Sequence, residues 1–174
     1  PHGSGWLSGP GSALHEMQIG FRDFGPGEHV FPAEHVRRFF TMMIEPSTYL
    51  GTLLAEVQGA GAEIRIHEVP DREAMRALPH AVIFNCTGLG AATLTGDTAL
   101  VPVKGQLSIL MPQPGIDYNL IHGDYYMFPR ADGIVLGGTY QRGETSTVPD
   151  ENAARRIVAA HQDFFERLRQ SQQV

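Results

Sequence analysis

The sequence contains a single cysteine, Cys86, among its 174 residues. One thiol excludes a disulfide bond within the chain, and with it the small secreted folds that disulfides hold together. This usage fits a reducing compartment, and we expect a cytoplasmic location. The histidines do not have the spacing of a helical metal-binding pair, so we also expect no metal site.

Positive charge is scarce as well. The chain has 13 basic residues against 19 acidic ones, a net charge of −6, and its one lysine is Lys104. Nucleic-acid binding relies on clustered basic side chains, so we expect no nucleic-acid partner. No apolar run is long enough to form a membrane-spanning helix, and we expect no membrane partner.

Apolar residues are plentiful enough to build a core. Hydrophobic residues make up 42% of the chain and charged residues 18%, which is typical of a globular domain. Apolar positions at helical spacing predict amphipathic helices over residues 45–59 and 149–168. An imperfect alternation over residues 63–69 predicts a strand.

The stretch AVIFNCTGLGAATL, residues 81–94, organises the rest of the chain. Its apolar start predicts a strand that is buried on both faces, followed by a glycine turn and a short helix. Such a turn presents free N–H groups to an anionic part of a ligand. It is not a dinucleotide fingerprint, because Thr93 replaces the third glycine and Gly96 ends the helix early.

Several segments then follow in an order that resembles a known family. They are NCTGLGA (85–91), GD (96–97), PVKGQ (102–106), YMFPR (126–130) and DGIVLGGT (132–139). This series resembles the central region of the FAD-dependent D-amino-acid oxidase (DAO) family of oxidoreductases, over about residues 42–168. The family usually has arginine at the position of Lys104.

The resemblance implies a cofactor, a substrate class and site residues. It implies FAD, with Cys86, Thr87, Gly88 and Gly90 on the adenosine or ribose side of that cofactor. It implies a small amine or amino acid as substrate, oxidised at its C–N bond by hydride transfer to the flavin. Tyr126 aligns with a family tyrosine that contacts the substrate.

A second substrate-contacting tyrosine of the family falls on His122. Imidazole differs from phenol in size and charge, so this chain departs from the family in one of its substrate contacts. No catalytic residue is assigned.

The second half of the chain predicts consecutive strands joined by short turns. Strand-like runs occur at 106–111, 119–122, 125–129 and 134–139. A turn at residues 112–115 follows the first run, and the pairs Gly123–Asp124 and Asp132–Gly133 separate the later ones. We therefore expect an α+β fold, with a mostly antiparallel sheet flanked by helices and part of a flavin-domain strand-turn-helix. In the DAO family, such a sheet carries the substrate in front of the flavin.

Two expectations concern domain organisation. Residues 1–40 are rich in glycine and proline and predict an irregular segment with a short strand at residues 17–21, while residues 41–174 resemble the central part of a DAO-like domain. Neither the Gly-x-Gly-x-x-Gly that holds the FAD pyrophosphate nor the family's later arginine segment is present. We expect a fragment that is inactive by itself, with the remaining parts of the same enzyme as its partners.

Two other functions compete with the oxidoreductase hypothesis. The sheet could be a flavin-free binding module for a small polar ligand, or the chain could be a structural domain without a site. Substitution of Tyr126 and His122 separates these hypotheses, because only an enzyme loses turnover.

Overall fold

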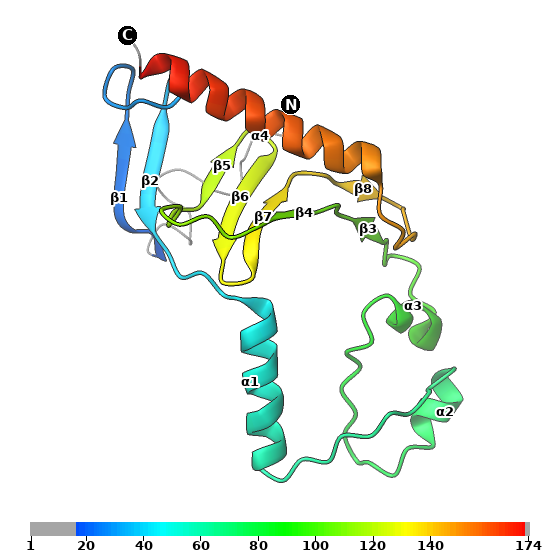
Figure 1. The fold of residues 1–174 in the computed structure, drawn as a ribbon. Coiled ribbons are helices and arrows are strands. Elements are labelled where there is room, and N and C mark those ends of the chain that lie inside the picture. Colours follow the sequence, from blue (N-terminus) through cyan, green and yellow to red (C-terminus); the bar gives the residue numbers. More distant parts are fainter. Residues whose placement is uncertain (1–16, 173–174) are drawn as a thin grey trace. The chain divides into compact units, whose positions relative to one another are not determined.

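The computed structural model describes residues 17–172. These residues form two compact units. Residues 17–44, 105–140 and 148–172 make up the first, here named the sheet unit, and residues 45–104 and 141–147 make up the second unit. Figure 1 shows the elements of both units along the chain.

A four-stranded antiparallel sheet forms the centre of the sheet unit. Its strands lie in the order β4–β7–β6–β5 and span Ser108–Leu110, Gly133–Gly137, Tyr125–Arg130 and Leu120–His122. Two-residue turns join β5 to β6 and β6 to β7. The first is the predicted pair Gly123–Asp124, whereas the second consists of Ala131 and Asp132, because Gly133 already belongs to β7. Helices and antiparallel strands together confirm the predicted α+β fold.

Helix α4, Glu151–Ser171, covers one face of this sheet (Figure 1). Asp150 fixes its start, because the Asp150 carboxylate accepts hydrogen bonds from the N–H groups of Asn152 and Ala153. The core between helix and sheet consists of four buried residues, Met127, Ile134, Leu136 and Ile157. The predicted apolar stripe of the helix is thus the side that contacts the sheet.

Residues 17–40 are more regular than the sequence predicts. Strands β1, Ile19–Phe24, and β2, Val36–Phe40, pair antiparallel. Arg37 lies opposite Asp23 in register and forms an ion pair with it at 2.8 Å. The sequence predicts only a short strand at residues 17–21, whereas cross-strand pairs stabilise a longer hairpin whose connection contains Gly25 and Gly27. Residues 1–16 lie outside the described part of the chain.

The second unit contains short elements. They are α1, Pro46–Gly59, α2, Arg72–Arg76, α3, Gly90–Thr95, and the antiparallel two-residue strands β3, Val103–Lys104, and β8, Gln141–Arg142. Helix α1 begins at its proline and ends at its glycine, as predicted. None of its residues is buried, however, so the predicted burial of its apolar face was wrong.

Two predicted strands are also absent from the second unit. Residues 63–69 and 81–84 do not form strands, and the side chains of Val82 and Phe84 are 70% and 86% exposed. A strand with two buried faces needs neighbouring strands and covering layers. Among residues 17–172, no strand pairs with either stretch. The apolar pattern therefore predicted a strand for which this part of the chain supplies no neighbour.

No helix within residues 17–172 combines the length and the apolarity that a membrane crossing requires.

Candidate functional site

The face of the sheet opposite α4 carries Tyr126. Side chains alternate along β6, and Met127 packs toward α4, so Tyr126 and Phe128 project from the other face. Their rings stack with centroids 4.8 Å apart and planes inclined by 25°. Both side chains are half-buried, so this face presents an aromatic surface that a small molecule can contact.

Gly137 seats the ring of Tyr126. The two residues are register partners on the neighbouring strands β6 and β7. A Cβ atom on Gly137 would collide with Cζ and the hydroxyl oxygen of Tyr126, so the ring lies across the bare backbone of the glycine. Gly137 and Phe128 together therefore fix where the Tyr126 hydroxyl lies.

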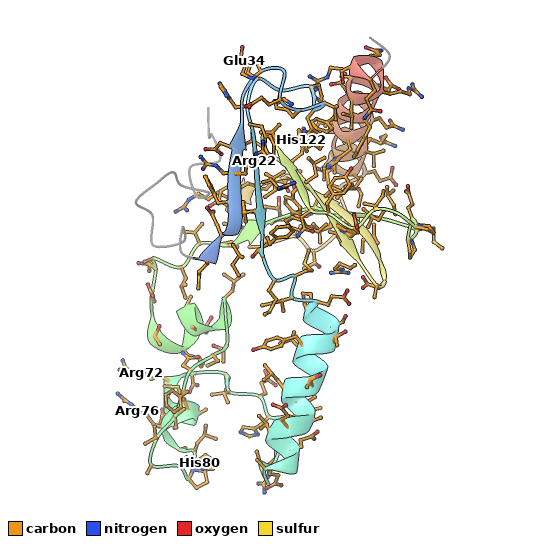
Figure 2. The ribbon with its side chains drawn as sticks, turned by 90° about the vertical axis from the view of Figure 1, so that its left-hand side faces the viewer. Arg22, Glu34, Arg72, Arg76, His80 and His122 are labelled. Atoms are coloured by element: carbon orange, nitrogen blue, oxygen red, sulfur yellow. The ribbon has the colours of Figure 1, made fainter. Side chains whose placement is uncertain are left out.

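His122 lies on the other face of the same sheet. It is the register partner of Tyr125, whereas Tyr126 is paired with Ile121. The His122 ring stacks on Phe164 of α4, with centroids 4.3 Å apart. Figure 2 shows His122 on β5, from which its ring faces α4. The structure thus places the two predicted substrate contacts on opposite faces, and a role for His122 in substrate binding stays a prediction.

The environment of His122 disfavours its charged form. Its Nε2 is buried and has no hydrogen-bond partner among the described residues. Burial is the main reason why the pKa of His122 is lowered to about 4, and the nearby His161 lowers it further. His122 is therefore neutral at neutral pH.

His161 links α4 to the strand of Tyr126. Its side chain is only 3% exposed. Its Nδ1 lies 2.8 Å from the carbonyl oxygen of Ile157, and its Nε2 lies 3.1 Å from the carbonyl oxygen of Tyr126. Nothing in the sequence indicates the contact between His161 and the Tyr126 carbonyl. The apolar neighbours of His161 on α4 were the one available signal that the ring is buried.

The glycine turn of the second unit contains the predicted cofactor contacts, Cys86, Thr87, Gly88 and Gly90. All four residues are exposed. Gly88 has a φ of 58°, and nothing lies within 4 Å of the position that its Cβ would take. A ligand can therefore approach this backbone closely.

Only some of the N–H groups of this turn are open to a ligand. Asn85 Oδ1 accepts hydrogen bonds from the N–H and the hydroxyl of Thr87, at 3.3 and 2.7 Å. Gly90 N–H donates to the Thr87 carbonyl at 3.1 Å. No hydrogen bond within residues 17–172 uses the N–H groups of Gly88 and Leu89.

Two open donors beside a bare glycine fit a polar edge of FAD, although the Thr87 N–H is already occupied. The assignment of Cys86, Thr87, Gly88 and Gly90 to the cofactor stays a prediction. The two predicted groups of site residues lie in different units, the turn in the second unit and Tyr126 in the sheet unit. No group of three or more His, Cys, Asp or Glu side chains within residues 17–172 could hold a metal ion.

Comparison with known proteins supports the resemblance seen in the sequence. The profile of the family described as FAD dependent oxidoreductase (DAO) matches residues 28–173. A D-amino-acid oxidase from Rubrobacter xylanophilus is 32% identical over 137 residues, which are 76% of this chain and 41% of the relative.

Two other relatives give a similar result. A D-amino-acid oxidase from Streptomyces coelicolor is 36% identical over 122 residues, 67% of this chain and 37% of the relative. A D-aspartate oxidase from Homo sapiens is 27% identical over 148 residues, 83% of this chain and 43% of the relative. This chain thus spans less than half the length of each of these relatives. Because the family profile matches most of its residues, the chain belongs to the DAO family of FAD dependent oxidoreductases.

Proposed function

We propose that this chain is part of an enzyme that oxidises the C–N bond of an amino acid or a related amine, with FAD as the hydride acceptor. The names of its relatives, D-amino-acid oxidase and D-aspartate oxidase, support this class of substrate. The observation that carries the proposal is the position of Tyr126, on the sheet face that α4 leaves open and with its ring seated on Gly137.

The protein's contribution would be to position the substrate. The Tyr126 hydroxyl would donate a hydrogen bond to a polar group of the substrate and hold its α-carbon in place. Its ring is held by Phe128 and Gly137, so little side-chain freedom is lost on binding. When bound, FAD would supply the hydride-acceptor chemistry for oxidation at the α-carbon, and water would hydrolyse the oxidised substrate.

The glycine turn would contact the cofactor through backbone groups. The open N–H groups of Gly88 and Leu89 would donate to polar atoms on the adenosine or ribose side of FAD. Gly88 allows that approach because it carries no Cβ. Cys86, Thr87 and Gly90 would line the same contact.

The proposal also covers FAD binding by the isolated chain and the location of the protein in the cell. The Gly-x-Gly-x-x-Gly that cradles a pyrophosphate does not occur before residue 81. The chain alone should therefore bind FAD weakly or not at all and should not turn over substrate. The remaining parts of the same enzyme would complete the site, in the cytoplasm.

An absorption spectrum tests the cofactor part of the proposal. The purified chain is mixed with FAD, passed through a desalting column and scanned in the visible range. We expect a colourless protein. Retention of one FAD per chain would contradict the proposal that the cradle is incomplete here.

Turnover tests the enzymatic part, measured with the chain completed by the remaining parts of the proposed enzyme. With D-alanine and D-aspartate as probes and L-alanine as the stereochemical control, Tyr126→Phe should raise KM or lower kcat/KM by about tenfold, the effect of one lost hydrogen bond. Tyr140→Phe is the matched control, because Tyr140 is 72% exposed and lies beyond β7. Equal activity of Tyr126→Phe and Tyr140→Phe would contradict the role of Tyr126.

A further inference from the structure

His161 occupies a position between two hydrogen-bond acceptors. Its Nδ1 faces the carbonyl oxygen of Ile157, one helical turn earlier on α4, at 2.8 Å. Its Nε2 faces the carbonyl oxygen of Tyr126, on strand β6, at 3.1 Å. Both contacts have hydrogen-bond distances, and both partner atoms accept but do not donate.

The number of protons on the ring decides how many of these contacts are hydrogen bonds. A neutral imidazole has one N–H and one lone pair, whereas an imidazolium has two N–H groups. The protonated ring therefore donates to both carbonyl oxygens. The neutral ring donates to one and turns a lone pair toward the other, which is repulsive.

The two distances indicate which link the neutral ring loses. The Nδ1 contact is shorter by 0.3 Å, and it joins neighbouring turns of the same helix. The proton should stay on Nδ1, so the contact of Nε2 with Tyr126 is the one that breaks. Loss of the proton thus removes a hydrogen bond between α4 and the strand that carries Tyr126.

The titratable and charged groups that face His161 come from β5, β6 and α4. On β5, the His122 ring lies 4.9 Å away, edge to face, and burial lowers the pKa of that ring to about 4. On β6, the Tyr125 ring lies 5.9 Å away. On α4, Asp163 and Arg167 neutralise each other in an ion pair at 3.0 Å.

His29 is a further histidine of the sheet unit, and an aromatic side chain connects it to helix α4. His29 contacts Phe31, with ring centroids 6.4 Å apart, and Phe31 in turn contacts Phe164 at 6.4 Å. Both ring nitrogens of His29 are buried without a hydrogen-bond partner among the described residues. Within residues 17–172, the ring contact of His29 is with Phe31 and not with His161.

We propose that His161 is a proton-dependent positioning residue that ties the backbone carbonyl of Tyr126 to helix α4. When His161 is protonated, its Nε2–H donates a hydrogen bond to the Tyr126 carbonyl and so links β6 to α4. When His161 is neutral, this hydrogen bond is lost. The inference concerns the chain itself and does not rest on the proposed oxidation of amines.

Nuclear magnetic resonance on the isotope-labelled chain tests this directly. The ring nitrogens of His161 and the carbonyl carbon of Tyr126 are followed from about pH 5 to 8, the range in which histidines titrate. We expect the Tyr126 carbonyl shift to change with the same midpoint as the His161 ring, with Nδ1 protonated throughout. A Tyr126 shift that does not follow the His161 ring, or a neutral ring protonated at Nε2, would overturn the proposal.

A pair of substitutions separates positioning from simple packing. His161→Gln places an amide N–H near the position of Nε2, so it should keep the Tyr126 link and remove its pH dependence. His161→Leu should lose the link at every pH. His67→Gln is the control, because His67 is exposed and lies in the second unit. It should leave the pH-dependent change of the Tyr126 carbonyl shift, the pH step, unchanged. A pH step at Tyr126 that persists in His161→Gln would refute the assignment even if His161→Leu does not fold.

Discussion

At Gly137, a single methyl group would take the space of the Tyr126 ring. We predict that Gly137→Ala displaces this ring and destabilises the sheet unit by about 1–3 kcal/mol, the usual cost of adding volume to a packed site. Urea unfolding followed by circular dichroism measures the free energy. The loss of the Tyr126–Phe128 stacking should appear as changed aromatic shifts.

Gly51→Ala is the matched control for this substitution. Gly51 lies within helix α1, and nothing is within 4 Å of the position that its Cβ would take. The same methyl group should there stabilise the chain by up to about 1 kcal/mol, because alanine favours helix. Equal effects of the two substitutions would show that the Tyr126 ring does not need the glycine.

His122 makes stability depend on pH. Its pKa is lowered to about 4 in the folded chain from an ordinary value of 6.5, so the unfolded chain takes up a proton first as pH falls. Stability should therefore decrease as pH drops from about 6.5 to about 4 and then lose nothing more through this group. We expect a loss of about 1–2 kcal/mol, less than the full shift would give, because water screens a partly buried ring.

His122→Phe tests this assignment. A phenyl ring keeps the stacking on Phe164 and removes the titrating group, including the buried Nε2 that has no partner among the described residues. The variant should be at least as stable as the wild-type chain near pH 4–5, in urea titrations repeated at several pH values. An unchanged slope of stability against pH in this variant would assign the effect to another residue.

At the scale of secondary-structure elements, helix α4 depends on its N-terminal cap. Asp150 accepts hydrogen bonds from the N–H groups of Asn152 and Ala153, at 2.9 and 3.0 Å. We predict that Asp150→Ala costs about 1 kcal/mol, whereas Asp150→Asn, which keeps an accepting oxygen, costs only a few tenths. Thermal unfolding of the three proteins under the same conditions gives the comparison, and equal losses in both variants would point to charge instead of capping.

The elements that the sequence predicted well are those that local pattern determines. Alternation and two-residue turns located β5, β6 and β7, and the apolar stripe with an acidic start located α4. Residues 63–69 and 81–84 were predicted wrongly as strands, since a strand exists only with a neighbour, and local pattern does not supply one.

The candidate site was predictable to a similar extent. The opposite directions of Tyr125 and Tyr126 follow from strand geometry alone. The two-residue turn at Gly123–Asp124 pairs His122 with Tyr125, so the separation of His122 from Tyr126 could have been inferred from the turn length. The contact between His161 and Tyr126 could not, because it joins residues 35 positions apart in different elements.

At the scale of the whole molecule, the second unit exposes apolar side chains for which the sequence predicts burial. Val82 and Phe84 are 70% and 86% exposed. Contiguous apolar surface of this kind promotes self-association. We predict that Phe84→Ser lowers the self-association of the chain, measured by sedimentation velocity over a range of concentrations, without loss of folded structure in the sheet unit.

His80→Ser is the control for this prediction. His80 is exposed and polar and precedes the same stretch, so its substitution should leave association unchanged. If the Phe84→Ser chain associates as strongly as the wild-type chain, the apolar stretch is not the contact.

The alternation of β6 has a consequence for how this protein can change. Met127 is buried in the core beneath α4, while its neighbours Tyr126 and Phe128 project from the face that the helix leaves open. Mutations on that face can therefore accumulate without disturbing the core, and under the proposed function they would alter the contact with the substrate. Laboratory evolution should find its gains in specificity among the even-numbered residues of this strand, and its loss of foldability among the odd ones.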